Sequence, residues 1–133
     1  MSDANHPTIT RDDSGAPAVD FDGAQKSHAL GVDVLEHGAG AAVVEGQTIT
    51  VHYTGWLWDG PKFDSSWDRG EPISFVIARG SLIDGWVEGL VGLPVGSKVL
   101  LVVPPESGYG DRDMGPIPGG STLVFAVDVV AAN

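Results

Sequence analysis

Apolar and polar residues alternate along much of the chain, as expected for β-strands with one buried and one exposed face. The clearest case is TITVHYTGWLW, residues 48–58, in which Ile49, Val51 and Tyr53 share one face and His52 lies on the other. Shorter apolar or alternating segments predict further strands at residues 30–36, 73–77, 98–104 and 121–130. Glycine and proline residues between these segments supply turns, so the chain is predicted to form mainly an antiparallel sheet.

One segment alone has the periodicity of a helix. In SLIDGWVEGLVGL, residues 81–93, the spacing i, i+3, i+4 and i+7 is occupied by Ile83, Trp86, Val87 and Leu90. Ser81 stands where a helix N-cap is expected. Gly85 and Gly89 each weaken the helix by about 1 kcal/mol relative to alanine, so it depends on packing against the sheet. These elements predict an α+β fold in which an antiparallel sheet of about five strands wraps around one short α-helix.

The first 28 residues differ in character from the rest of the chain. Residues 1–28 are polar and acidic with scattered proline and glycine, and we expect them to form a flexible N-terminal extension. Within this extension PAVDF, residues 17–21, has the composition of a short edge strand on the domain. Residues 29–133 are expected to form a single folded domain with one core.

Composition and charge limit the functions open to the chain. The formal net charge of −11 disfavours nucleic acids and anionic membranes as partners. The chain has no cysteine, which excludes disulfides, thiol nucleophiles and thiolate metal sites. No apolar run is long enough to predict a membrane-spanning helix, and no signal peptide is visible at the N-terminus. We therefore expect a cytoplasmic protein, with an exported form if a signal peptide has been removed.

The polar residues do not form a recognisable metal, nucleophile or phosphate site. No histidine has a partner at ligand spacing, and Asp59, Asp64 and Asp68 do not follow the calcium-loop pattern. Nothing selects one pair of carboxylates for glycoside hydrolysis, and neither a nucleophile elbow nor a phosphate-binding glycine loop is present. No metal or cofactor is expected. What remains is a set of aromatic residues from different segments, each of which would singly be assigned to the core: Tyr53, Phe63, Trp86, Tyr109 and Phe125.

These aromatic residues lie in blocks that resemble a known family. The blocks are VHYTGWLWDGPKFDSSWDRGEP, GSLIDGWVEGLVGLPVGSKVLLVVPPESGYG and IPGGSTLVFAVDVV. In their order and spacing, from about Leu30 to Val130, they resemble the FKBP-type peptidyl-prolyl cis-trans isomerases in the small single-domain form. The resemblance implies an antiparallel sheet wrapped around one short helix, which agrees with the fold predicted from the apolar pattern.

The resemblance also implies a shallow apolar cleft between helix and sheet that takes a proline ring. Asp64 corresponds to a pocket carboxylate that acts electrostatically near the twisting amide, and Tyr109 to a rim hydroxyl that holds a substrate carbonyl; these are the expected catalytic residues. Arg69 corresponds to a basic residue that keeps Asp64 ionised. The expected substrate-binding residues are Tyr53, Phe63, Arg69, Ile73, Leu82, Ile83, Trp86, Ile117 and Phe125.

The chain departs from the family pattern at several positions. Ile73 stands where many members have phenylalanine, so one wall of the cleft should be smaller. The rim loop GDRDMGPIPGG, residues 110–120, is about one residue shorter than in the best-known members, and it has Pro116 and Ile117 where they have two isoleucines. Ser81 replaces an acidic residue of the family pattern. These differences bear on macrolide affinity and substrate preference. The family pattern gives no role to three tryptophans: Trp67 is expected at the surface, and Trp56 and Trp58 are expected to cover the sheet.

The implied function is peptidyl-prolyl cis-trans isomerisation during protein folding, a reaction that breaks no bond and so needs no metal or cofactor. The expected partners are proline-containing polypeptides or unfolded client proteins, with macrolide inhibitors as a second ligand class and a monomer as the working form. The alternative hypothesis is a binding module that holds proline-containing segments with little or no catalysis.

Overall fold

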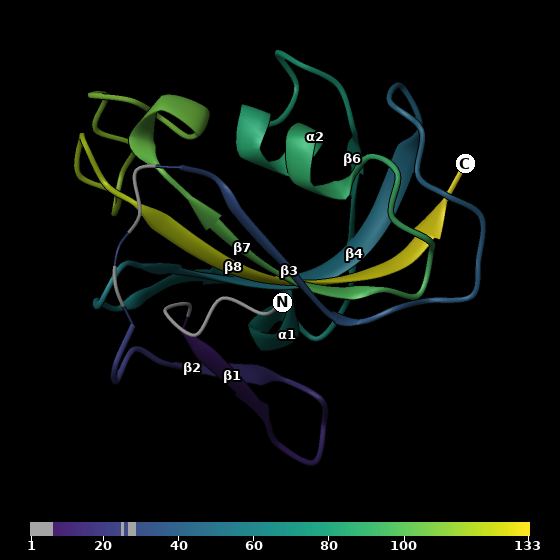
Figure 1. Ribbon diagram of the computed structural model, residues 1–133, viewed down its shortest axis with the longest axis horizontal. Coiled ribbons are helices and arrows are strands. Elements are labelled where there is room, and N and C mark those ends of the chain that lie inside the picture. Colours follow the sequence, from purple (N-terminus) through teal and green to yellow (C-terminus); the bar gives the residue numbers. More distant parts are fainter. Residues whose placement is uncertain (1–6, 25, 27–28) are drawn as a thin grey trace.

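The computed structural model describes residues 7–24, 26 and 29–133, and its main body is an antiparallel sheet (Figure 1). The sheet has six strands, of which five follow the order β3-β7-β8-β4-β5 and the sixth, β6, also pairs with β4. The strands are β3 (Gly31–Glu36), β4 (Thr48–Leu57), β5 (Lys62–Ser65), β6 (Ile73–Val76), β7 (Lys98–Val103) and β8 (Leu123–Ala132). The predicted α+β fold is confirmed, with β5 as a short strand that the apolar pattern did not reveal.

The long strands β4 and β8 form the centre of the sheet and pair along nearly their whole length. On the other edge of β4, residues 54–56 pair with β5 and residues 48–51 pair with β6. The face of β4 that carries Ile49, Val51 and Tyr53 is buried, as the alternation predicted. This face forms the main core together with the helix.

The helix α2 (Asp84–Leu90) lies across the buried face of the sheet (Figure 1). Ile83 occupies the N-cap position, and no side chain caps the helix, so the prediction that Ser81 caps it is wrong. Both helix glycines are needed for close packing. A Cβ on Gly85 would lie 2.7 Å from Val103 Cγ1, and one on Gly89 would lie 2.6 Å from Leu101 Cδ2. The residues that weaken the isolated helix are thus the ones that let it rest on β7.

A β-hairpin covers the opposite face of the sheet (Figure 1). Its strands β1 (Thr8–Arg11) and β2 (Pro17–Asp20) pair with each other and not with the main sheet. Here the structure differs from the flexible extension expected for residues 1–28, and PAVDF contributes to this hairpin and not to an edge of the domain. Residues 1–6, 25, 27 and 28 of that expected extension lie outside the described residues.

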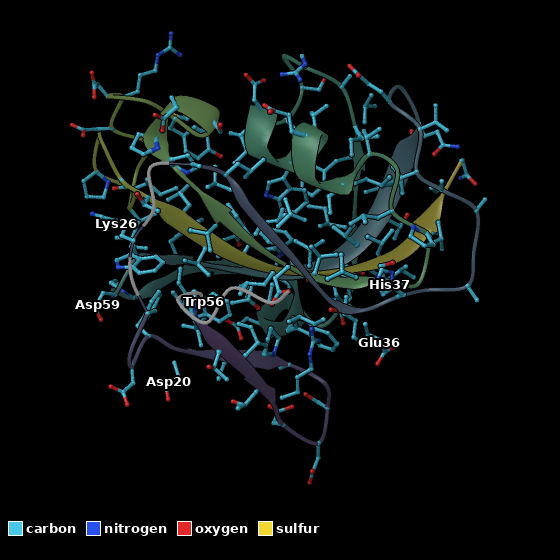
Figure 2. The ribbon with its side chains drawn as sticks, in the orientation of Figure 1. Asp20, Lys26, Glu36, His37, Trp56 and Asp59 are labelled. Atoms are coloured by element: carbon cyan, nitrogen blue, oxygen red, sulfur yellow. The ribbon has the colours of Figure 1, made fainter. Side chains whose placement is uncertain are left out.

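The hairpin packs on the sheet because the central strands are apolar on both faces. Beneath the hairpin lies a second buried cluster of Trp56, Leu100, Val102, Val124 and Ala126. Figure 2 shows Trp56 on the side of the sheet that faces the hairpin. Ile9, Val19 and Phe21 pack against this cluster, so hairpin residues remove apolar sheet surface from water.

Among the described residues, no helix is long and apolar enough to cross a membrane.

Candidate functional site

A cavity of about 580 Å³ opens between α2, the buried face of the sheet and the loops at one end of both. It is open to solvent on one side and combines aromatic, aliphatic and charged groups. Its lining residues are Tyr53, Phe63, Asp64, Phe75, Gly80, Ser81, Leu82, Ile83, Asp84, Trp86, Gly108, Tyr109, Arg112 and Phe125. A partly open, largely aromatic cavity with a few polar groups is typical of a small-ligand site.

Trp86 is the centre of the aromatic lining. It projects from α2 and is only 3% exposed. Its ring meets Tyr53 edge-to-face at 5.3 Å and 85° and Phe125 at 5.4 Å and 82°. Phe75 from β6 packs against it at 5.6 Å, and Phe63 from β5 meets Phe125 at 5.7 Å and 90°. Edge-to-face contacts in this range are favourable, so the rings form a rigid apolar box.

Gly55 allows two of these rings to come together. A Cβ at this position would lie 2.7 Å from Phe63 Cζ and 2.9 Å from Phe125 Cε1. A real side chain would therefore push apart the two aromatic walls contributed by β5 and β8. The glycine of the YTG motif is thus required by the close approach of the rings.

Asp64 is the central polar group of the site. The Tyr53 hydroxyl donates a hydrogen bond to Asp64 Oδ2, and the backbone N–H of Ser65 donates to Oδ1 at 2.9 Å. Arg69 Nη1 lies 2.5 Å from Asp64 Oδ1 and forms a partly exposed ion pair. Arg69 is the last residue of the short helix α1 (Ser66–Arg69), which directly follows β5. A tight strand-to-helix connection therefore places Arg69 beside the Asp64 carboxylate, which lines the cavity.

These contacts determine the protonation states at the site. Burial alone would raise the pKa of Asp64, but hydrogen bonds from Tyr53 and Arg69, together with the Arg69 charge, hold that pKa below its usual value. Burial raises the pKa of Tyr53 to about 12, and the hydrogen bond to Asp64 contributes to the shift. Burial, then the charge of Asp64, also raises the pKa of Tyr109. Of these three groups, Asp64 is therefore ionised at neutral pH, and Tyr53 and Tyr109 are neutral phenols.

Tyr109 forms part of the cavity rim and comes shortly after the 3₁₀ turn η1 (Pro105–Ser107). The side chain is partly buried against the core. Within the described part of the chain, no group forms a hydrogen bond with its hydroxyl. The neutral phenol is therefore a donor that a ligand in the cavity can use.

The structure brings most of the predicted site residues to the cavity lining, and leaves out Arg69, Ile73 and Ile117. Arg69 pairs with Asp64 and lines a neighbouring hollow of about 280 Å³. Ile117 is 5% exposed and packs in the main core, where its backbone bridges to Met114. Ile73 pairs with Val51 in the sheet and also packs against that core.

Phe75 is the aromatic lining residue that the sequence reasoning missed, and Gly80, Asp84, Gly108 and Arg112 also line the cavity without having been predicted. It lies two residues after Ile73 on the same face of β6, and its ring contacts Tyr53 at 6.1 Å as well as Trp86. The signal was present in ISFVI, because alternate residues of a strand share a face. The cleft wall that was expected to be smaller because of Ile73 therefore has an aromatic ring, which Phe75 supplies.

Among the described residues, no three histidine, aspartate or glutamate side chains gather in a way that could hold a metal ion. His6 and His28 lie outside the described residues.

Comparisons with known proteins agree on one family. A sequence model described as FKBP-type peptidyl-prolyl cis-trans isomerase matches residues 40–130. The chain is 45% identical over 111 residues to FK506-binding protein 2 of Emericella nidulans, covering 81% of this chain and 82% of that protein. It is 46% identical over 103 residues to an FK506-binding protein of Neisseria meningitidis, covering 77% of this chain and 94% of that protein.

Among solved structures, FkpA from Escherichia coli superimposes with a TM-score of 0.73 and 38% sequence identity. The superposition covers 94% of this chain and 51% of the FkpA chain, so the similarity concerns about half of that larger protein.

Proposed function

The chain belongs to the FKBP-type peptidyl-prolyl cis-trans isomerase family, and from that premise we propose that its aromatic cavity seats the proline ring of an Xaa-Pro segment while the peptide bond rotates. The enzyme catalyses cis–trans isomerisation and acts on proline-containing polypeptides. Uncatalysed Xaa-Pro rotation takes tens to hundreds of seconds and can limit folding. The substrates are therefore chains that are folding or conformationally flexible around proline.

The aromatic box carries this proposal, because it suits the energetics of amide rotation. The barrier of about 18–20 kcal/mol arises from resonance that makes the planar amide polar. An apolar cavity removes water that stabilises the planar form, and a rigid wall of rings favours the shape of the twisted one. Trp86, Tyr53 and Phe125, which are nearly completely buried, provide such a surface.

The polar groups around the box have distinct proposed roles. We assign the Tyr109 hydroxyl to a substrate carbonyl, since no neighbour within the described residues occupies that donor. Asp64, held ionised by Tyr53 and Arg69, provides a negative charge at the cavity edge that favours the charge redistribution of the twisting amide. Leu82 and Ile83 line the approach to the N-terminal end of α2 and contact the substrate backbone.

Two further proposals concern the ligands of the cavity and the oligomeric state of the active protein. The relatives are named for binding FK506, and we propose that this chain also takes a macrolide in the same cavity. We further propose that a monomer is active, because one chain supplies the whole lining of the cavity.

A protease-free isomerisation assay on a short Xaa-Pro peptide tests the proposed function of the cavity. The wild-type protein should accelerate the exchange far above the thermal rate, and a macrolide of the FK506 type should abolish the acceleration by occupying the box. Background rates together with measurable peptide binding would instead identify a binding module. Acceleration that a bound macrolide leaves intact would place the reaction outside this cavity.

Replacing Tyr109 with phenylalanine should reduce kcat/KM by about two- to tenfold, the effect of losing one hydrogen bond. The ring remains, so packing against the core and the melting temperature should change little. The same peptide assay, with a thermal melt in parallel, checks both statements. An unchanged kcat/KM would remove the hydroxyl from the mechanism.

A further inference from the structure

The tryptophans to which the family pattern assigns no role, Trp56, Trp58 and Trp67, all have neighbours in the N-terminal hairpin or the segment directly after it. Trp56 belongs to the buried cluster that the hairpin covers, and Trp58 meets Phe21 edge-to-face at 5.1 Å. The ring of Trp67 approaches the hairpin turn, where a Cβ on Gly15 would lie 3.1 Å from its Cη2 atom. The hairpin and this set of tryptophans therefore form one packed unit on the outer face of the sheet.

An ion pair fastens the hairpin to the central strand β8. Arg11 donates two hydrogen bonds to the carboxylate of Asp128, at 2.9 and 2.8 Å, and a third to the carbonyl of Gly15 at 3.0 Å. The side chains of Arg11 and Asp128 are only 21% and 13% exposed. A bidentate, partly buried pair of this kind has defined geometry, so it fixes the position of the Gly15 turn relative to the sheet.

Trp67, a residue of helix α1, packs against this turn and so connects the helix to the hairpin. Its ring stacks on His52 of β4 with centroids 4.0 Å apart and an interplanar angle of 15°. The indole Nε1 is buried and has no hydrogen-bond partner in the described structure. Packing between the Gly15 turn and His52, without a hydrogen bond from the indole, therefore holds the ring, and α1 begins one residue before Trp67.

The contacts continue from Trp67 through the sheet to the cavity. Ser66 Oγ lies 2.8 Å from His52 Nδ1, accepts a hydrogen bond from the Tyr53 N–H at 2.7 Å and donates one to the Tyr53 carbonyl at 3.2 Å. On the inner face, the Tyr53 hydroxyl binds Asp64, and the last residue of α1, Arg69, binds the same carboxylate. Helix α1 is thus held by the hairpin on one face and carries a site residue to the other.

We propose that Trp67 is a positioning residue, through which the N-terminal hairpin holds α1 in place and so aligns Asp64, Arg69 and Tyr53 at the isomerase cavity. The inference rests on the proposed role of Asp64. It makes residues 8–20 part of the functional unit, although they lie on the face of the sheet opposite to the cavity.

The test compares Trp67→Leu with Trp58→Leu. Both changes remove a tryptophan from the packed unit on the outer face, but only Trp67 lies on α1. With Trp67→Leu, kcat/KM should fall by about two- to fivefold, in the range of indirect couplings between packed residues. The pKa of the Asp64 carboxyl, followed by ¹³C NMR at a temperature where the variant is folded, should rise towards its ordinary value. Trp58→Leu should reduce stability while leaving the rate and the Asp64 titration unchanged.

Two further variants keep the test decisive. Trp67→Phe retains an aromatic ring above His52 and should restore most of the activity and the low pKa of Asp64. Arg11→Gln loosens the hairpin without changing α1, and it should shift both readouts in the same direction as Trp67→Leu. If Trp67→Leu and Arg11→Gln lower the melting temperature but leave kcat/KM and the Asp64 titration at wild-type values, the hairpin is only a stabilising element. The wild-type protein is measured in the same assay. If it accelerates isomerisation, the proposed function holds even when the proposed role of the hairpin fails.

A second inference starts from the charges that line the cavity. Asp64 is paired with Arg69 at 2.5 Å, and Asp84 has Arg79 at 3.4 Å. The third charged lining residue, Arg112, is exposed on the rim loop after Tyr109. Its guanidinium makes no ion pair or hydrogen bond with any described residue, and nearby Asp113 accepts a hydrogen bond from the Gly119 N–H at 2.7 Å. Arg112 is therefore the uncompensated charge at the cavity.

The geometry points to Arg112 as a specificity residue that favours an acidic side chain next to the substrate proline. This inference deepens the proposed isomerase function of the same cavity. An extended peptide whose proline lies on Trp86 passes the rim, where a carboxylate could form the ion pair that Arg112 lacks. The overall charge of −11 repels acidic peptides at long range, so the preference must come from this local contact.

Matched peptides with glutamate or glutamine directly before or after proline test this inference. The measured quantity is the ratio of kcat/KM for the glutamate peptide to kcat/KM for the glutamine peptide. In Arg112→Gln this ratio should fall by about two- to fivefold for at least one of the two positions, as expected for the loss of a partly exposed ion pair. Lys98→Gln makes the same charge change beside Asp128 on the hairpin side and should leave the ratio unchanged. An unchanged ratio in Arg112→Gln, or an equal fall in Lys98→Gln, would overturn the inference. Turnover of the glutamine peptide by the wild-type protein shows independently that the isomerase is active.

Discussion

Replacing Trp86 with alanine is expected to lower the free energy of unfolding by about 3–5 kcal/mol, as for other buried aromatic residues. Trp86 is 3% exposed and contacts three aromatic rings, so its removal leaves a large cavity between α2 and the sheet. Because Gly85 and Gly89 give α2 low intrinsic helix propensity, the helix depends on this packing. Urea unfolding of both proteins at the same pH measures the difference.

Trp58→Ala provides the matched control for this prediction. Trp58 is half-buried on the outer face, where it contacts Phe21, so the same change of residue there should cost clearly less stability. If Trp86→Ala has the same urea midpoint of unfolding as the wild-type protein, packing of this side chain does not hold α2 on the sheet. Peptide isomerisation should also be lost in Trp86→Ala under conditions where the variant is folded, because the box loses the ring that the other aromatic side chains surround.

Replacing Asp64 with asparagine is expected to lower kcat/KM by about tenfold while the protein remains folded. The loss should be smaller than the roughly hundredfold or greater effect of removing a donor from an enclosed oxyanion site, since solvent screens this partly exposed carboxylate. Asparagine keeps the shape and can still accept a hydrogen bond from Tyr53. The change therefore isolates the negative charge, and the protease-free peptide assay measures the result.

Asp68→Asn is the control for the charge change. Asp68 lies four residues further along the chain, and its side chain is 60% exposed in an ion pair with Lys62. Removing that charge should leave kcat/KM within about a factor of two, because exposed ion pairs contribute little. Wild-type activity in Asp64→Asn would show that the carboxylate only organises the strand-to-helix connection. A similar loss in both variants would attribute the effect to overall charge.

The parts of the fold that could be predicted were those encoded in short-range patterns. Strict alternation in β4 predicted its buried face, and the i, i+3, i+4, i+7 spacing predicted which side of α2 packs on the sheet. Most of the cavity followed from motif positions, because strand ends and the helix bring those residues together in this family. Ser81 shows the limit of local rules, since a side chain suited to capping is not used when the helix begins later.

Other features depended on contacts between distant segments. Phe75 and Ile73 occupy the same face of β6, and only the position of α2 decides that the former reaches the cavity. Ile117 was expected to contact the substrate, but its side chain packs in the main core. Such outcomes cannot be obtained from alternation, which assigns a residue to a face but does not specify its neighbour on that face.

By itself, the sequence determined the α+β class, the buried face of β4, the helix and every aromatic residue of the cavity except Phe75, because each depends on periodicity or on a contiguous motif. Only the tertiary structure decided the role of the N-terminal residues and of Trp56, Trp58 and Trp67. A polar, acidic segment gives no local signal for folding, and residues 8–20 become ordered where the outer face of the sheet offers apolar surface to cover. The partner of that segment lies more than thirty residues away in sequence, beyond the reach of any local pattern.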